Sequence, residues 1–94
     1  MNLTKHASDR LQQRGIPRFA VDLLHEYGAR RYDHHGVVIR YFDKRSRERL
    51  ARERGRAVVA HLAGVLNVYM VVSAEDGTVL TVAHRYPGKR IARN

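Results

Sequence analysis

Three consecutive residues near the end of the chain, His84, Arg85 and Tyr86, carry complementary chemistry. A histidine can donate or accept a proton near neutral pH, an arginine can bind two phosphate oxygens at once, and a tyrosine can stack on a nucleic-acid base. Cleavage of RNA needs a base for the 2′-hydroxyl, an acid for the leaving 5′-oxygen and cations beside the phosphate. The same residues also suit an ordinary polar strand end, so their neighbours in the fold decide between the two interpretations.

His6 is a second histidine that suits proton transfer. We expect it in the first turn of a helix, where the positive end of the helix dipole favours the neutral imidazole that a general base needs. Arg10 follows one turn later on the same helix. A histidine in such a position is more often structural, so His6 takes part in catalysis only if the fold brings it close to His84.

The segment from Lys44 to Arg56 is rich in arginine, and four of its arginines recur at helical spacing. Side chains at i, i+4, i+7 and i+11 lie on one side of an α-helix. Such a row can follow the phosphates of a nucleic acid, with an affinity that falls steeply with salt. It can equally be a solvated helix face, partly neutralised by the pair Glu48–Arg52. Arg54 is discordant, because it falls on the apolar side, where it either extends its charge to solvent or marks a polar cleft. The row consists of Arg45, Arg49, Arg52 and Arg56.

The composition limits the classes of protein and partner. The chain has 94 residues, a net charge of +9 and no cysteine, which indicates one domain without disulfides or thiolate metal sites. Residues 30–56 hold ten Lys/Arg against four Asp/Glu, so the charge is concentrated in the middle third. Nucleic acid is the first candidate partner, an acidic protein is the second, and a membrane surface is the third. Because no apolar run approaches the roughly 18 residues of a membrane span, we expect a cytoplasmic protein without a membrane partner.

Hydrophobic periodicity and turn signals predict an α+β fold with the order α-α-β-β-α-β-β. The economical arrangement is a mainly antiparallel sheet with the helices packed on one face. We expect Thr4 to cap the first helix and Gly15 to end it, and Gly55 is a weak point in the longest helix. One domain is expected over residues 1–88, followed by a flexible basic tail over residues 89–94. The expected helices are Lys5–Arg14, Pro17 to about Tyr27 and Lys44–Val65, and the expected strands are Arg31–Asp33, Val37–Asp43, Leu66–Ser73 and Thr78–Arg85.

Alternation along these strands predicts a second sheet face with few large apolar side chains, which suits a ligand better than a core. On this face Arg40 would hold a phosphate backbone, Arg85 would stabilise the phosphate during cleavage, and Tyr69 would orient a base. The face is expected to carry Arg40, Asn67, Tyr69, Thr81 and Arg85.

Three segments of the chain resemble a family of small bacterial proteins of unassigned function. They are KHASDRLQQRGI (Lys5–Ile16), RYFDKRSRERL (Arg40–Leu50) and NVYMVVSAEDGTVLTVAHRY (Asn67–Tyr86). The shared pattern opens with a histidine, an arginine four residues on and then Arg-Gly-Ile, and it closes with a strand that ends in His-Arg-Tyr. The resemblance covers nearly the whole chain and implies a relationship to the RelE-like and barnase-like ribonuclease-toxin fold.

That resemblance also implies an activity and a partner. Toxins of this group cleave RNA without a metal and are encoded beside an antitoxin. One feature departs from the group, because RelE-like toxins usually begin with a strand, whereas the first element expected here is a helix. The residues that stand in the shared motifs are His6, Arg10, Lys44, His84, Arg85 and Tyr86.

The residues and the resemblance together predict a metal-independent endoribonuclease toxin without a cofactor. Its partners would be RNA, with ribosome-associated mRNA among the candidates, and a cognate antitoxin protein. Two alternatives stay open: a nucleic-acid-binding module that does not cut, and a basic domain that docks an acidic partner protein. The expected catalytic residues are His6, Lys44, His84, Arg85 and Tyr86, and the expected nucleic-acid-binding residues are Arg10, Arg40, Arg45, Arg49, Arg52, Arg56 and Tyr69.

Overall fold

The computed structural model describes residues 1–62, 64 and 66–85. Within this part the chain forms four helices and a four-stranded antiparallel sheet, so the predicted α+β class is confirmed. No helix in these ranges is long and apolar enough to cross a membrane. The helices are α1 (Lys5–Arg14), α2 (Arg18–Tyr27), α3 (Lys44–Arg54) and α4 (Arg56–His61), and the strands are β1 (Ala29–Tyr32), β2 (Val37–Tyr41), β3 (Val68–Ser73) and β4 (Val79–His84).

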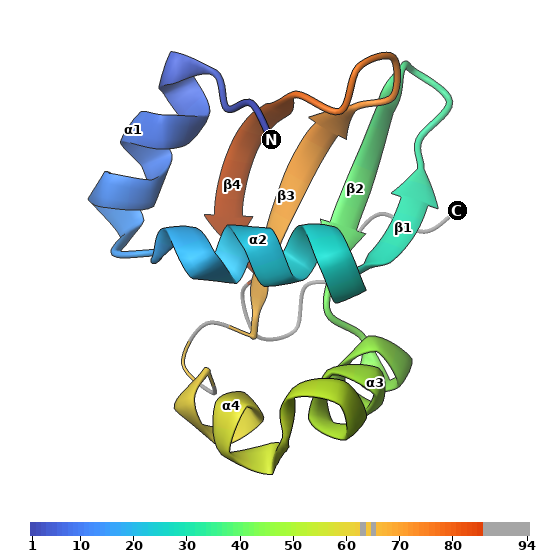
Figure 1. Ribbon diagram of the computed structural model, residues 1–94. Helices are drawn as coiled ribbons and strands as arrows, with labels where there is room; N and C mark the ends of the chain where they lie inside the picture. Colours follow the sequence, from blue (N-terminus) through green and yellow to red (C-terminus); the bar gives the residue numbers. More distant parts are fainter. Residues whose placement is uncertain (63, 65, 86–94) are drawn as a thin grey trace.

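The sheet is a meander in which each strand pairs with the next one along the chain, in the order β1-β2-β3-β4. α1 lies beside β4, and α2 crosses the same face over β2 and β3 (Figure 1). α3 and α4 lie beyond the end of the sheet where β2 finishes and β3 begins (Figure 1). The opposite face, which we call the open face, carries no helix of the described part of the chain. Its partly exposed side chains include Val37, Ile39, Tyr41, Tyr69, Val71, Thr81 and Ala83.

The core lies between the sheet and the two N-terminal helices, and it continues toward α3 and α4. Val68 and Met70 face it from β3 and Leu24 faces it from α2, all three without exposed surface. Leu50 of α3 and Leu62, the C-cap residue that follows α4, are also buried in the same cluster. Because these apolar side chains hold α3 against the core, its charged residues are distributed over the surfaces on either side.

Thr4 performs the predicted cap and also ties the first helix to the sheet. Its hydroxyl oxygen accepts a hydrogen bond from the backbone N–H of Ala7 at 3.0 Å and donates one to the carbonyl of Leu80 at 3.1 Å. Gly15 ends α1 with a left-handed conformation, at φ 63°. The beginning of α1 is therefore fixed beside the first residues of β4.

The predicted continuous helix over Lys44–Val65 is wrong in its middle, because Gly55 divides it into α3 and α4. Gly55 has φ 93° and ψ 155°, a backbone conformation that residues with a Cβ atom rarely adopt. α4 is short and ends at His61, and Val65 lies outside the described residues. The division places Arg56 on α4, so the predicted row of arginines does not lie on one continuous helix.

Arg40 lies on the face opposite to the one predicted. In the β2–β3 register it pairs with buried Met70, and Phe42, two residues on, is also buried. Since side chains two residues apart share a face of a strand, Arg40 points under α2 into the core and is only 9% exposed. The open face consequently presents Tyr41 at the end of β2 instead of Arg40.

Candidate nucleic-acid interface

An open cleft of about 760 Å³ lies between α3 and the neighbouring ends of β2 and β4. We call it the α3 cleft. Five of its side chains are cationic and two are carboxylates, so it carries a formal excess of three positive charges. Opposite charge at this density favours an anionic ligand. The cleft is lined by Tyr41, Phe42, Asp43, Lys44, Arg47, Glu48, Ala51, Arg52, Arg56 and Arg85.

Asp43 sets the position of α3 along one wall of the cleft. Its carboxylate accepts a hydrogen bond from the backbone N–H of Ser46 at 2.9 Å, and the Ser46 hydroxyl donates to the Asp43 carbonyl at 3.0 Å. Burial acts to raise the pKa of Asp43, but the hydrogen bonds with Ser46 outweigh it, and the pKa is lowered from its ordinary value. Asp43 therefore stays ionised as a helix cap, and Lys44 and Arg47 follow it in the first turn of α3.

Two of the five cations are held by the protein backbone. Arg85 extends across the end of the sheet, where its Nη1 donates to the carbonyl of Phe42 at 3.4 Å and its guanidinium lies 5.7 Å from the ring centre of Tyr41. Arg47 donates from Nη2 to the carbonyl of Leu66 at 3.3 Å. Arg85 thus reaches β2 from the end of β4, and the two arginines join the cleft walls.

The other three cations of the cleft are available to a ligand. Lys44, Arg52 and Arg56 form no hydrogen bond or ion pair with the described part of the chain. All three are exposed. The fold brings Lys44 and Arg85, both predicted to stabilise a phosphate, into one cleft with Arg52 and Arg56, both predicted to bind nucleic acid.

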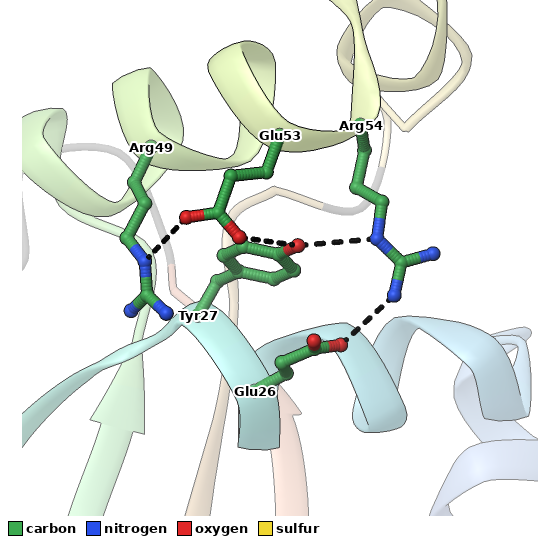
Figure 2. A network of polar contacts seen from close by, with 5 residues as sticks. All are labelled: Glu26, Tyr27, Arg49, Glu53 and Arg54. Atoms are coloured by element: carbon green, nitrogen blue, oxygen red, sulfur yellow. Dashed lines mark hydrogen bonds and ion pairs between the residues drawn. The ribbon is translucent and has the colours of Figure 1, made fainter.

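Arg49 and Arg54, by contrast, are turned toward α2 (Figure 2). The Nε of Arg49 donates to Glu53 at 3.1 Å, and its guanidinium lies 5.0 Å from the ring centre of Tyr27. The Tyr27 hydroxyl donates to Glu53 at 3.2 Å and accepts from the Nε of Arg54 at 3.1 Å. Arg54 also donates to Glu26 at 3.0 Å. We call these five residues the Tyr27 network, and it explains why a charged residue occupies position 54.

The Tyr27 network shifts the pKa values of two of its own members in the direction that keeps them charged. The hydrogen bond from Arg49 is the largest influence on Glu53, and it lowers the pKa of that carboxyl. The hydrogen bond with Tyr27 is the largest influence on Arg54, and it raises the pKa of that guanidinium. Both groups therefore remain charged at neutral pH. The predicted row of arginines is consequently split, with Arg52 at the cleft, Arg49 in the network and Arg45 exposed outside both.

Arg40 serves the structure and is not placed to bind a ligand. Its Nη2 donates to the carbonyls of His25 and Gly28, at 2.8 and 2.9 Å, and these carbonyls belong to the C-terminal end of α2. Burial, followed by the charge of Arg30, lowers the pKa of Arg40. The side chain satisfies backbone acceptors that the helix leaves free at its end.

The structure does not bring His6 and His84 together. The cap at Thr4 places the exposed His6 near the first residues of β4, whereas His84 is the last residue of that strand. His84 is four positions after Leu80, which corresponds to about 13 Å of extended strand. A shared role in proton transfer needs hydrogen-bond reach, directly or through one water. Arg10 lies on α1 and also does not line the α3 cleft.

His84 and Arg85 lie on opposite sides of the strand end. His84 pairs with buried Val68, whereas Arg85 turns toward Tyr41. His84 Nδ1 lies 3.2 Å from Oδ1 of Asn67, and the Asn67 amide nitrogen donates to the Arg85 carbonyl at 3.4 Å. Because the Asn67 oxygen can only accept, a hydrogen bond between the two side chains requires a proton on Nδ1 of His84. Tyr86, the third member of the predicted cluster, lies outside the described residues.

Six of the ten residues that line the cleft were not predicted from the sequence, among them the three side chains Tyr41, Arg47 and Glu48. The spacing contained a signal for two of them. Lys44, Arg47 and Glu48 stand at i, i+3 and i+4, so they share a side of the helix that begins after Asp43. Tyr41 required knowledge of the register, because only the pairing of β2 with β3 shows which sheet face it occupies.

Comparisons with protein families, with curated proteins and with solved structures found no match.

Proposed function

We propose that this domain binds the phosphate backbone of RNA in the α3 cleft. The observation that carries the proposal is the meeting of five cationic side chains from two distant segments of the chain, three of them without a hydrogen bond or ion pair to the residues that the structure describes. Guanidinium groups match phosphate geometry well, since they can donate two parallel hydrogen bonds. The choice of RNA among polyanions rests on the resemblance of the sequence motifs to ribonuclease toxins.

The direct test measures binding of a labelled single-stranded RNA at several salt concentrations. Replacing both Arg52 and Arg56 by alanine should weaken binding and reduce the slope of log K against log salt by about 0.7 for each lost phosphate contact. Arg45→Ala is the matched control, because Arg45 is an exposed arginine on the same helix outside the cleft. Equal affinities for the wild type and the double variant would overturn the proposal.

RNA cleavage by a metal-independent endoribonuclease toxin is the second candidate. The observation in its favour is that Glu48 lies in the same cleft as Lys44 and Arg85. Glu48 would accept the proton of a 2′-hydroxyl while the 2′-oxygen of the RNA attacks phosphorus. The bond to the 5′-oxygen would break, and that oxygen would take a proton from Lys44 or water, while Arg85 stabilises the charge on phosphate. The products are a 2′,3′-cyclic phosphate and a 5′-hydroxyl.

Glu48→Gln separates cleavage from binding. In EDTA, the wild type should release 2′,3′-cyclic phosphate ends from RNA, and the variant should bind RNA at least as tightly but leave it intact. Arg85→Ala should lose both activities, and His84→Ala reports on the predicted proton transfer by that residue. If RNA stays intact with the wild type and with all three variants, the proposed cleavage is wrong and RNA binding remains as the proposed function.

An acidic antitoxin is the protein partner that the motif resemblance implies, and we propose that it meets the same charged cleft. It would then compete with RNA, because both ligands need Arg52 and Arg56. Co-purification with the product of a neighbouring reading frame, followed by displacement with RNA, tests this. A complex that persists unchanged in the Arg52 and Arg56 double variant would place the partner elsewhere.

A further inference from the structure

Two tyrosines lie next to each other on the open face of the sheet. Tyr41 of β2 and Tyr69 of β3 are directly opposed in the antiparallel register, so their Cβ atoms are about 5 Å apart. The residues on either side of Tyr69, Val68 and Met70, point into the core. Tyr69 therefore points away from α1 and α2, and both tyrosines are partly exposed.

The tyrosine pair is continuous with the α3 cleft. Tyr41 is itself part of the cleft wall, and the guanidinium of Arg85 lies over its ring. A nucleic acid held by Lys44 and Arg52 would thus have the two rings beside its backbone.

We infer that Tyr41 and Tyr69 form a stacking platform for unpaired bases, so that the nucleic acid accepted by the cleft is single-stranded. The inference rests on the proposed function, because it assumes that the cleft holds the backbone. An aromatic ring stacks on any base, but in a duplex both faces of each base are already stacked and its edges are paired. A single strand can turn its bases onto the sheet while its phosphates remain at the arginines.

The pair also has a purely structural interpretation, because opposed aromatic residues stabilise antiparallel strands. That role would lower thermal stability on mutation but would not alter the preference between single and double strands. The discriminating measurement is therefore a ratio of affinities for ligands that share phosphates and differ in base accessibility.

The experiment compares three ligands: a single-stranded RNA, a duplex of the same length, and inorganic polyphosphate, which has no bases. The wild type should prefer the single strand to the duplex by at least about tenfold. Tyr69→Leu should lower single-strand affinity by about 5- to 150-fold, the range for loss of one base–aromatic stack, and leave polyphosphate affinity unchanged. Tyr69→Phe keeps the ring and should keep the affinity.

Tyr32→Leu is the control for the loss of a tyrosine from the sheet. Tyr32 is 57% exposed, and its partner Val38 lies opposite Val72, a core residue, so it belongs to the other face. Its loss should leave all three affinities unchanged. If the Tyr69→Leu variant does not fold, a fluorescence measurement on the wild type tests the same inference. The chain has no tryptophan, so its tyrosine fluorescence should fall on adding single-stranded RNA and stay constant with polyphosphate.

Two different results would overturn the inference, and only the second would also overturn the proposed function. Equal binding of single strand and duplex, insensitive to Tyr69→Leu but dependent on Arg52 and Arg56, would remove the platform and leave the cleft as a phosphate site. Failure of all three ligands to bind would remove the proposed function and the platform with it.

Discussion

The two sides of α3 use the same residue type for different purposes. On one side Arg49 and Arg54 are fixed over Tyr27 by hydrogen bonds with Glu53, Tyr27 and Glu26. On the other side Arg52 faces the α3 cleft without an ion pair in the described part of the chain. The difference shows that an arginine-rich helix is not one uniform basic surface. Whether an arginine can bind a ligand depends on whether its guanidinium already forms hydrogen bonds with carboxylates or contacts an aromatic ring of the protein.

Tyr27→Ala should have the largest effect, because it removes the ring on which the packed side of α3 rests. Tyr27 is 4% exposed, and truncating a buried aromatic residue costs about 3 kcal/mol. The midpoint of urea unfolding should fall accordingly. Tyr27→Phe keeps the ring and loses only the hydroxyl bonds, which costs about 1 kcal/mol. Equal stabilities for the two variants and the wild type would show that the network does not support α3.

Gly55→Ala should come next, because it acts on the junction between α3 and α4. An alanine at φ 93° and ψ 155° is strained by about 1–3 kcal/mol. If α3 and α4 joined into one helix to relieve the strain, Arg56 would stand four residues after Arg52 and on the same side of the helix. We therefore expect lower stability with little change in RNA affinity, measured by chemical unfolding and by anisotropy. A clear loss of affinity would show that the break at Gly55 sets the position of Arg56 in the cleft.

A matched pair of charge reversals compares the two sides of the helix directly. Arg52→Glu should lower RNA affinity by about tenfold or more with little change in stability, because it removes a phosphate contact and adds repulsion. Arg49→Glu should lower stability by about 1 kcal/mol, through the lost ion pair and cation–π contact, and change affinity less. If both variants lost affinity equally, the two sides would be one interface.

The smallest effect is expected at the cap that positions α3. Asp43→Ala should cost about 1 kcal/mol. Because the pKa of Asp43 is lower in the folded chain than its ordinary value of 3.8, its stabilisation is present above that value and is lost as the pH falls through the folded pKa. Asp43→Asn keeps a capping group without titration, so its stability should fall less steeply below pH 3.8. Identical acid unfolding of the wild type and Asp43→Asn would contradict this.

Local signals predicted local structure well. The cap at Thr4 and the end of the first helix at Gly15 depend on residues that are close in sequence, so their positions followed from residue type. The strand bounds were less accurate. β1 begins at Ala29, directly after α2, and not at Arg31, because an edge strand this short lacks a distinct hydrophobic pattern.

The positive charge of the candidate site was predicted from the sequence, but the set of residues that form the site was predicted only in part. Lys44, Arg52, Arg56 and Arg85 do meet in one cleft. Arg40 does not join them, because strand alternation gives two faces without saying which of them the helices cover. His6 and His84 lie near opposite ends of β4, since the register of α1 along that strand is set by long-range contacts of Thr4.

The sequence alone determined the α+β class, the capped first helix and the concentration of positive charge in residues 30–56, because these depend on composition, periodicity and neighbours along the chain. The tertiary structure decided which arginines are free. Arg49 and Arg54 are occupied by Tyr27 and Glu26, more than twenty residues away in sequence, whereas Arg52 faces a cleft completed by Arg85 from the end of β4. Such pairings follow from packing and strand register, and no periodic pattern within one segment contains them.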